Sequence, residues 1–140
     1  YFNSQGVIMT VEDLVEEAKK AREKAYVPYS HFKVGAALET KDGHIIHGCN
    51  VENASYGLCN CAERSAFYSA ISQGYKPNEF LRLAIVGDTV EGCSPCGACR
   101  QVIFELGGEN FPVFMGNLHG TIQETTSTKL LPGAFGPKEL

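Results

Sequence analysis

The sequence of 140 residues lacks any apolar stretch near the roughly 18 residues that a membrane-spanning helix needs. Its N-terminus also lacks the basic region and apolar run of a secretion signal. Positive charge is scarce, since twelve Lys and Arg face sixteen Asp and Glu and give a formal net charge of -4. Such a chain offers no electrostatic footprint for a phosphate backbone or an anionic membrane. We therefore expect a cytoplasmic protein whose partners include no membrane and no nucleic-acid polymer.

Internal repeats and low-complexity tracts are absent as well, and the composition is that of an ordinary folded domain. Apolar residues make up 44% and charged residues 20% of the chain, which argues against disordered, collagen-like and coiled-coil classes. The length fits one domain. We expect this domain to span residues 9–140. Residues 1–8 show no helical or strand period, and we expect them to be an expression remnant or a disordered N-terminus.

Hydrophobic patterns predict strands that alternate with helices. Thr10 and Asp13 form a capping box before a helix over about residues 11–25, and Pro28 prevents its continuation. This order of elements predicts an α/β fold with a single mixed five-stranded sheet covered by helices on both faces. The strands are expected at residues 32–40, 44–49, 81–87, 111–115 and 121–126, and the later helices at 62–74 and 96–107, with at most one helical turn at 128–131.

Six cysteines are the most informative residues of the chain. Closely spaced thiols in a protein without a secretion signal more often bind metal or do redox chemistry than form structural disulfides. Cys61 and Cys96 fall at predicted helix N-termini, where partial positive charge and free N–H groups stabilise a thiolate. The set consists of two close pairs and two single residues, namely Cys59 with Cys61, Cys96 with Cys99, and Cys49 and Cys93.

The cysteine spacing allows three kinds of site. If Cys61, Cys96 and Cys99 bind one zinc ion, a fourth position stays open for water, as in a catalytic site. Glu63 then lies two residues from a ligand and can carry protons. If Cys59 joins the other three, four thiolates form a closed structural site in a non-catalytic domain. A redox pair at Cys96 and Cys99 is the third alternative, although nothing around it resembles a thioredoxin-type unit.

Three motifs together resemble those of the small, homo-oligomeric cytidine deaminases that bind zinc with three cysteines. They are Asn50-Val51-Glu52-Asn53-Ala54-Ser55-Tyr56, Cys61-Ala62-Glu63-Arg64 and Pro95-Cys96-Gly97-Ala98-Cys99-Arg100. The resemblance covers about residues 11–135 and implies one cytidine deaminase-like domain over residues 9–140. It implies zinc-dependent hydrolytic deamination of cytidine and 2'-deoxycytidine to uridine and 2'-deoxyuridine plus ammonia, in pyrimidine salvage. A deaminase of a modified cytosine nucleoside, such as blasticidin S, and a non-catalytic structural-zinc domain stay open as alternatives.

The resemblance implies a role for each residue of the metal site. Cys61, Cys96 and Cys99 hold one zinc ion per subunit. Glu63 moves protons to the pyrimidine ring and to the leaving amine. Three thiolates need charge compensation, for which Arg64 is the first candidate and Arg100 the second.

The resemblance also implies a set of substrate contacts, in which a carboxylate and an amide satisfy ribose hydroxyls and favour a nucleoside over a nucleotide. Phe135 lies in a Gly/Pro-rich tail with little local structure to bury it. The resemblance implies that Phe135 reaches the active site of a neighbouring subunit in a homotetramer; the residues alone also allow it to fold back on its own core. The implied substrate-binding residues are Phe32, Asn50, Glu52, Tyr56, Ala62 and Phe135.

Overall fold

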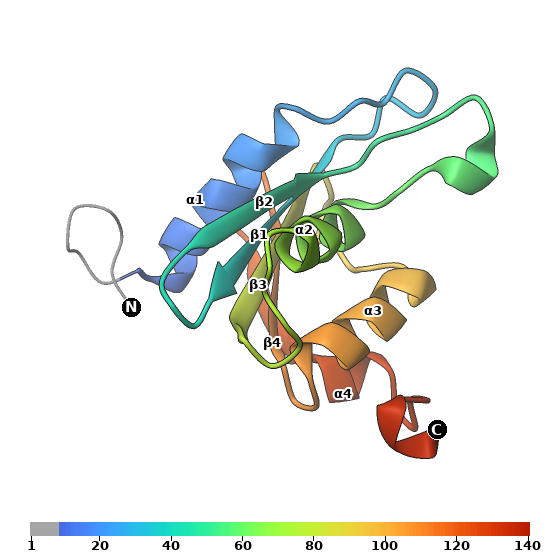
Figure 1. The fold of residues 1–140 in the computed structure, drawn as a ribbon. Helices are drawn as coiled ribbons and strands as arrows, with labels where there is room; N and C mark the ends of the chain where they lie inside the picture. The colour runs from blue at the N-terminus through green and yellow to red at the C-terminus, as the bar shows by residue number, and fades with distance from the viewer. Residues whose placement is uncertain (1–8) are drawn as a thin grey trace.

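A single five-stranded sheet organises residues 9–140, the part of the chain that this computed structural model describes (Figure 1). Our expectation for residues 1–8 lies outside the described residues. None of the helices in the described part is long and apolar enough to cross a bilayer.

In chain order the elements are α1 (Val11–Arg22), β1 (Val34–Thr40), β2 (Ile45–Cys49), the 3-10 turn η1 (Tyr56–Leu58), α2 (Ala62–Ser72), β3 (Phe80–Gly87), α3 (Gly97–Gly107), β4 (Pro112–Asn117), β5 (Ile122–Thr126), α4 (Ser127–Leu130) and the 3-10 turn η2 (Pro137–Glu139).

The order of the strands across the sheet is β2-β1-β3-β4-β5. Strands β3 and β4 run parallel, because α3 carries the chain back between them, whereas the other neighbouring pairs are antiparallel. The carboxyl ends of the two parallel strands therefore lie at one edge of the sheet. The β3–α3 loop (residues 88–96) starts from this edge. This topology confirms the predicted single mixed five-stranded sheet.

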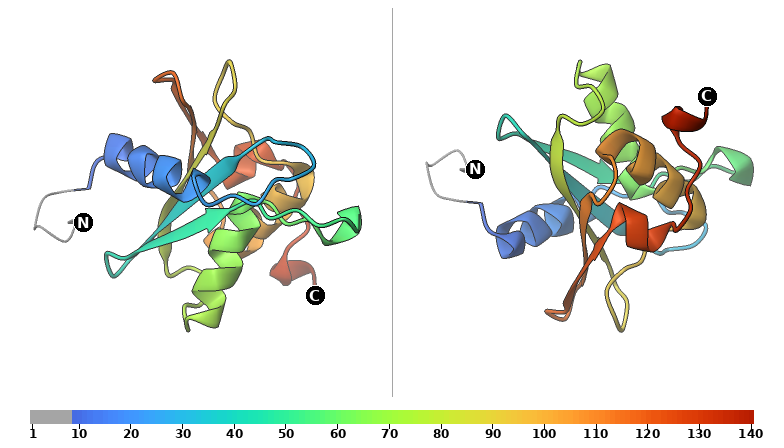
Figure 2. Two further views of the ribbon diagram at one scale, coloured as in Figure 1. Left: turned by 90° about the horizontal axis from the view of Figure 1, so that it is seen from above. Right: turned by 90° about the horizontal axis from the view of Figure 1, so that it is seen from below.

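Helices cover both faces of the sheet, as predicted (Figure 2). On one face, α1 buries Leu14 and Val15 in a cluster that includes Ala37 of β1. On the other face, α2 and α3 bury Phe67 and Ile103 completely in the larger cluster. Every residue of β1 is buried, as expected for a strand with a helix on each side.

Two glycines let the helices approach the sheet closely. A Cβ atom at Gly35 would lie 2.0 Å from the carbonyl oxygen of Ala18 in α1, and one at Gly48 would lie 2.3 Å from that of Ala62 in α2. A side chain at either position would push the helix away from the strand, since backbone atoms cannot move aside cheaply. Gly48 thus fixes the position of the N-terminal turn of α2 on the sheet.

Helix α1 is shorter than predicted, although its capping box forms. Asp13 N donates to Thr10 Oγ1 and Thr10 N donates to Asp13 Oδ2, each at 3.1 Å. The helix ends at Arg22 instead of about residue 25. Tyr26 N donates to Asn50 O at 3.0 Å, which draws the chain out of the helix and towards the sheet. This long-range contact decides the boundary, and the local helical pattern does not contain it.

Strand β1 also begins two residues later than predicted. The side chain of Asn50 lies beside the entry to the strand, where its Nδ2 donates to Phe32 O and its Oδ1 accepts from Val34 N, both at 2.8 Å. A side-chain amide thus replaces part of the ladder that a longer strand would form. The strand proper starts at Val34.

Candidate metal centre and active site

The N-termini of α2 and α3 bring three cysteines together. Cys61 is the N-cap residue of α2 and Cys96 the N-cap residue of α3, and Cys99 lies in the first turn of α3. Cys61 Sγ lies 3.7 Å from Cys96 Sγ, which lies 3.5 Å from Cys99 Sγ. All three sulfur atoms lie within 4.8 Å of one another. Two helix N-termini thus direct their partial positive charge at one cluster of thiols.

The spacing of these sulfur atoms fits a zinc ion. Thiolates bind zinc at about 2.3 Å in a tetrahedron, whose edges are then about 3.8 Å long. The observed separations of 3.7 and 3.5 Å are close to that edge. Within residues 9–140, Cys61, Cys96 and Cys99 form the group that could hold a metal ion. Three protein ligands leave one position of the tetrahedron for water, which is the arrangement of a catalytic site.

Cys59 does not join this cluster. Its thiol bonds to the backbone of Asn53 instead, accepting from Asn53 N at 3.3 Å and lying 3.6 Å from Asn53 O. A closed site with four thiolates is therefore not formed by the described residues. This placement favours the open three-cysteine site over the structural-zinc alternative.

Glu63 is a buried carboxyl next to the thiol cluster. It lies in the first turn of α2, and 4% of its surface is exposed. Burial raises the pKa of Glu63 to about 7, and the negative charge of Cys61 adds to this effect. A carboxyl in these surroundings can take up and release protons at neutral pH.

Arg64 and Arg100 take different positions around the cysteines. Arg64 Nη2 donates to Cys61 Sγ at 3.4 Å, so Arg64 lies where it can offset thiolate charge. Hydrogen bonds, first with Cys99 and then with Arg64, lower the pKa of Cys61 to about 5. Arg100 instead donates to the carbonyl oxygens of Pro95 and Leu130, both at 2.9 Å. It also donates to Ser94 Oγ at 2.8 Å. These bonds favour Arg64 over Arg100 for charge compensation, because the hydrogen bonds of Arg100 go to backbone and a hydroxyl group and not to a thiol.

The predicted ribose-binding residues lie on one group of loops. Glu52 accepts hydrogen bonds from Tyr29 N at 3.0 Å, from Ser30 N at 3.1 Å and from the Ser30 hydroxyl. The Ser30 hydroxyl is the main cause of the lowered pKa of Glu52. A cavity of about 270 Å³ lies here, lined by Tyr29, Ser30, Glu52, Tyr56 and Cys59. The role of Ser30 was not predicted, since no motif connects it with a glutamate 22 positions away.

Phe32 and Ala62 lie close to the same group of loops. Phe32 is 41% exposed, and its ring edge would lie 3.2 Å from a Cβ atom at Gly87. The missing side chain at Gly87 thus leaves space for the ring. Ala62 is completely buried, so only its backbone, at the N-terminus of α2, is available to a ligand. Its N–H is one of the free donors of the first helical turn.

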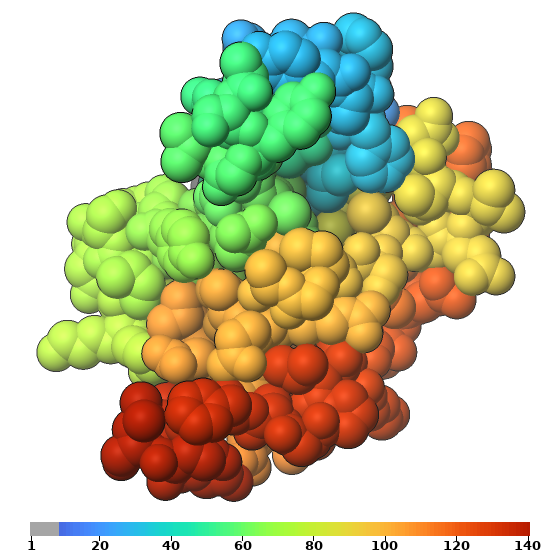
Figure 3. Space-filling view, turned by 90° about the vertical axis from the view of Figure 1, so that its right-hand side faces the viewer, coloured from blue at the N-terminus to red at the C-terminus, as the bar shows by residue number. Residues whose placement is uncertain are grey.

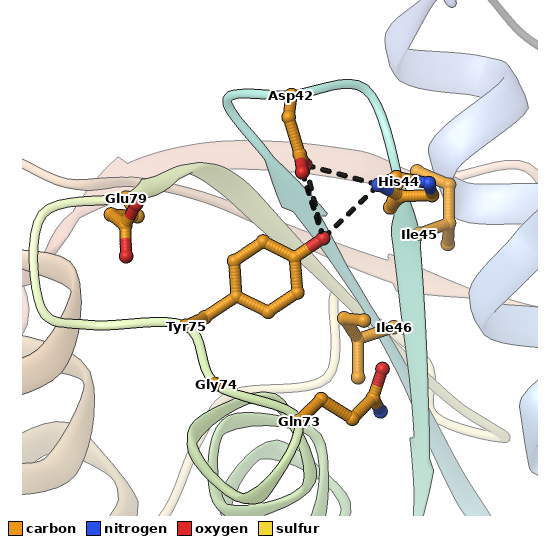
Figure 4. A pocket seen from close by; sticks show the side chains of 8 residues that line it. All are labelled: Asp42, His44, Ile45, Ile46, Gln73, Gly74, Tyr75 and Glu79. Carbon is orange, nitrogen blue, oxygen red and sulfur yellow. Dashed lines mark hydrogen bonds and ion pairs between the residues drawn. The ribbon is translucent and has the colours of Figure 1, made fainter.

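A larger cavity lies at the other end of α2, away from the cysteines. It has a volume of about 550 Å³ and is lined by residues that follow α2 and by the β1–β2 turn (Figure 4). Its polar groups bind one another, since Tyr75 Oη lies 3.1 Å from both carboxylate oxygens of Asp42 and 3.0 Å from His44 Nδ1. The cavity contains no cysteine, and α2 separates it from the thiol cluster. Size alone therefore does not identify the functional site.

Comparison with known proteins gives the family. The family model described as the cytidine and deoxycytidylate deaminase zinc-binding region matches residues 9–115. The chain belongs to this deaminase family. Cytidine deaminase from Sporosarcina psychrophila is 58% identical over 132 residues, which is 94% of this chain and 96% of that protein. The cytidine deaminase from Halalkalibacterium halodurans is 54% identical and covers 91% of this chain and 95% of its own length.

Solved structures of the deaminase family show the same fold. The crystal structure of cytidine deaminase from Burkholderia pseudomallei superimposes with a TM-score of 0.90 at 59% identity and covers 91% of this chain and 100% of that chain. A cytidine deaminase structure from Mycobacterium tuberculosis has a TM-score of 0.75 at 41% identity, with coverage of 89% and 96%. These matches confirm the predicted family, fold class, deaminase activity and zinc cofactor.

Two of the exposed aromatics of the predicted site, Tyr56 and Phe135, do not pack into the core of the described chain. Tyr56 is 71% and Phe135 57% exposed, although Gln101 Nε2 donates to Phe135 O at 2.7 Å and holds the tail on α3. Figure 3 shows the face where the loops gather: the segments around residues 26–32 and 50–60 lie above the start of α3, and the C-terminal tail lies below it.

Proposed function

We propose that this chain catalyses hydrolytic deamination of cytidine and 2'-deoxycytidine to uridine and 2'-deoxyuridine plus ammonia. The observation that carries this proposal is a buried Glu63 next to three thiols at the spacing of zinc ligands. Two proteins that are 58% and 54% identical to this chain carry the name cytidine deaminase. The proposed deaminase domain comprises residues 9–140.

The proposed metal site consists of Cys61, Cys96 and Cys99. When bound there, zinc supplies a Lewis acid that activates water at neutral pH. Glu63 would take one proton from the attacking water and deliver it to the ring nitrogen N3 of the pyrimidine. It would then take the proton of the new C4 hydroxyl and deliver it to the leaving amine, so that the C4 carbonyl forms as ammonia departs. Arg64 limits the negative charge of the three thiolates through its hydrogen bond to Cys61.

The proposed substrate site lies on the loops beside the metal centre. Asn50 uses one N–H and one lone pair for the backbone of residues 32 and 34, so one donor and one acceptor stay available for a ribose hydroxyl. Glu52 adds acceptor oxygens, and its negative charge disfavours a phosphate. Phe32 and the N–H of Ala62 are assigned to the base. Tyr56 and Phe135 are assigned to the boundary with a neighbouring subunit.

The proposed assembly is a homotetramer with active sites at subunit boundaries, working in cytoplasmic pyrimidine salvage. Large apolar side chains support the assembly, because Tyr56 and Leu58 are each 71% exposed and Tyr29 is 46% exposed. Tyr29 and Tyr56 are in edge-to-face contact, with ring centroids 5.8 Å apart. An apolar group of this size on one face is typical of a protein–protein contact.

The proposed activity is tested by the ultraviolet absorbance change on mixing purified protein with cytidine, 2'-deoxycytidine or blasticidin S. Wild type is compared with Glu63→Ala and with the isosteric Glu63→Gln, and zinc content is measured for all three. We expect wild type to convert cytidine, and both variants to keep zinc but lose at least about 100-fold in kcat, because proton transfer is lost. Zinc-loaded wild type that leaves all three nucleosides unchanged would contradict the proposed activity.

A further inference from the structure

Asn117 is a buried polar residue that the mechanism above does not use. It is the last residue of β4, opposite Gly87 at the end of β3, and 1% of its surface is exposed. The β3–α3 loop leaves the sheet directly after Gly87 and ends at Cys96. Asn117 therefore lies beside the start of the segment that delivers a proposed zinc ligand.

The carboxamide of Asn117 has every hydrogen-bonding position filled by backbone. Its Nδ2 donates to Thr89 O at 3.1 Å and to Val90 O at 3.0 Å in the β3–α3 loop. Its Oδ1 accepts from His119 N at 2.9 Å and from Thr121 N at 3.0 Å in the β4–β5 turn. A carboxamide offers two donors and two lone pairs, so the side chain joins the loop to the turn with no group left over.

Two further contacts hold the next residues of the same loop against β4 and β5. Gly92 N donates to Gln123 Oε1 and Cys93 N donates to Gly116 O, both at 2.9 Å. The loop lies very close to β4 at this point, since a Cβ atom at Gly92 would lie 2.4 Å from Met115 O. The loop has no helix or strand of its own between β3 and α3. The first part of its path is therefore set by these contacts, of which the buried bonds to Asn117 come first along the chain. The part next to Cys96 is also held by Arg100, which donates to Ser94 Oγ at 2.8 Å and to Pro95 O at 2.9 Å.

A zinc centre allows only small displacements of its ligands, so a change in the path of this loop would disturb it. Zinc–ligand distances vary by about 0.2 Å, and Cys96 Sγ must keep its 3.5 and 3.7 Å separations from the other two sulfurs. Cys96 is the N-cap residue of α3 and thus the point where the loop meets the helix. A loop released from β4 would let Cys96 move relative to Cys61, which is carried by a different helix.

We propose that Asn117 is a positioning residue for the zinc centre, because its carboxamide fixes the loop that delivers Cys96. Since Cys96 is a zinc ligand of the proposed function, the role of Asn117 rests on that function. Asn117 touches neither substrate nor metal ligand in the described contacts. It acts through the β3–α3 loop alone.

The test compares zinc release from three zinc-loaded proteins, with a colorimetric chelator in excess: wild type, Asn117→Asp and Ser127→Ala. Asn117→Asp keeps the oxygens that bind the β4–β5 turn but removes both donors to the loop. Ser127 is the matched control, because it is also buried and bonds backbone, donating to Gly108 O at 2.7 Å and accepting from Phe111 N at 3.0 Å. It lies at the far end of α3 from Cys96.

We expect Asn117→Asp to release zinc about tenfold faster than wild type, as for other residues that orient metal ligands. Ser127→Ala is expected to release zinc at the wild-type rate, even if its melting temperature falls as far as that of Asn117→Asp. In steady-state kinetics with cytidine, Asn117→Asp should lower kcat and leave KM near wild type. Zinc release from Asn117→Asp that is no faster than from Ser127→Ala would overturn the proposal.

A second pair of variants decides the question if Asn117→Asp does not fold. Gln123 is exposed, so Gln123→Ala removes the bond to Gly92 N without opening the core. We expect it to speed zinc release about threefold, in proportion to one lost hydrogen bond, whereas Gln123→Glu keeps the acceptor and should behave as wild type. Equal rates for the two variants would overturn the proposal. Failure of the proposed function appears separately, as zinc-loaded wild type that does not deaminate cytidine.

Discussion

At the scale of single residues, the site depends on which thiols face one point. Cys61, Cys96 and Cys99 lie at the ends of two helices that begin close together, whereas Cys59, two positions before Cys61, faces the backbone of Asn53. A difference of two positions in the sequence thus separates a metal ligand from a residue of the neighbouring loop. The two residues belong to different elements, since Cys59 is the C-cap residue of the 3-10 turn η1 and its thiol bonds to Asn53, whereas Cys61 is the N-cap residue of α2.

The first residue-scale prediction follows from this division of the cysteines. Cys59→Ser is expected to keep one zinc ion per chain and wild-type kcat, because its thiol is not among the ligands. Cys96→Ser should lose zinc, because a hydroxyl is a poor substitute for a thiolate on this metal. Zinc content by atomic absorption, measured beside deaminase activity, checks both variants. Loss of zinc from Cys59→Ser would restore the structural site with four thiolates.

Sequence motifs were most informative about residues that lie close together in the sequence. Cys61, Glu63 and Arg64 come together because α2 presents them within its first turn, so local sequence is sufficient to place them. Contacts between distant residues were not predictable in this way. Ser30 with Glu52, and Arg100 with Leu130 O, depend on how loops cross in the folded chain. Hydrogen bonds of this kind carry no periodic signal in the sequence.

At the scale of elements, close packing of helix on sheet fixes where the catalytic helix ends lie. Gly48 lets α2 approach β2, and the buried face of α2 holds it there through Ala66 and Phe67. Patterns in the sequence predicted these elements, because the hydrophobic periodicity of a helix or strand depends only on residues that are close together in the sequence. The true ends of α1 and β1 differ from prediction, because Tyr26 and Asn50 form contacts with distant backbone. The sheet supports the site, and the loops complete it.

A buried ion pair between β1 and β3 gives a prediction at this scale. Glu39 and Arg82 are register partners, with Arg82 Nε 2.5 Å from Glu39 Oε1, and Glu39 is 1% exposed. Arg82→Met leaves a buried carboxylate without its partner and should lower the free energy of unfolding by about 3–5 kcal/mol. The double variant Glu39→Leu with Arg82→Met should be more stable than Arg82→Met alone, because it removes that isolated charge.

Denaturant unfolding of the zinc-loaded proteins measures this effect, with Glu39→Leu completing the cycle. Arg82 Nη2 also donates to Met9 O at 2.8 Å, so both variants without the arginine lose this contact equally. The comparison therefore isolates the buried carboxylate. If the double variant loses as much free energy of unfolding as the two single variants lose in sum, the isolated buried charge is not the cause of the instability of Arg82→Met.

At the scale of the whole molecule, the face that carries the loops leaves several large apolar side chains exposed in a single chain. The loops around the metal centre, including the segment around residues 50–60, gather on this face (Figure 3). Tyr56 and Leu58 belong to that segment and are each 71% exposed. Phe135 is 57% exposed, at the end of a tail held on α3. The proposed assembly, in which a second copy completes the site, would explain why such side chains are left outside the core of one domain.

The whole-molecule prediction concerns Phe135. Phe135→Ala is expected to raise KM for cytidine about tenfold or more, as for other large aromatic contacts that are truncated, and to leave zinc content unchanged. Leu140→Ala is the matched control, since Leu140 lies in the same tail and is 97% exposed. It should have wild-type kinetics. Steady-state assays and light scattering on both variants separate loss of a substrate contact from loss of the assembly.

A mixing experiment tests whether Phe135 acts in its own site or in that of a neighbour. Glu63→Ala chains carry an intact Phe135, and Phe135→Ala chains carry an intact Glu63. If the tail reaches the neighbouring site, mixed assemblies contain sites with both groups intact, and KM at those sites should return towards wild type. If Phe135 serves its own chain, no combination restores a complete site, and the mixture should show only the kinetics of Phe135→Ala. Co-expressed chains with two different affinity tags allow the mixed assemblies to be purified for this comparison.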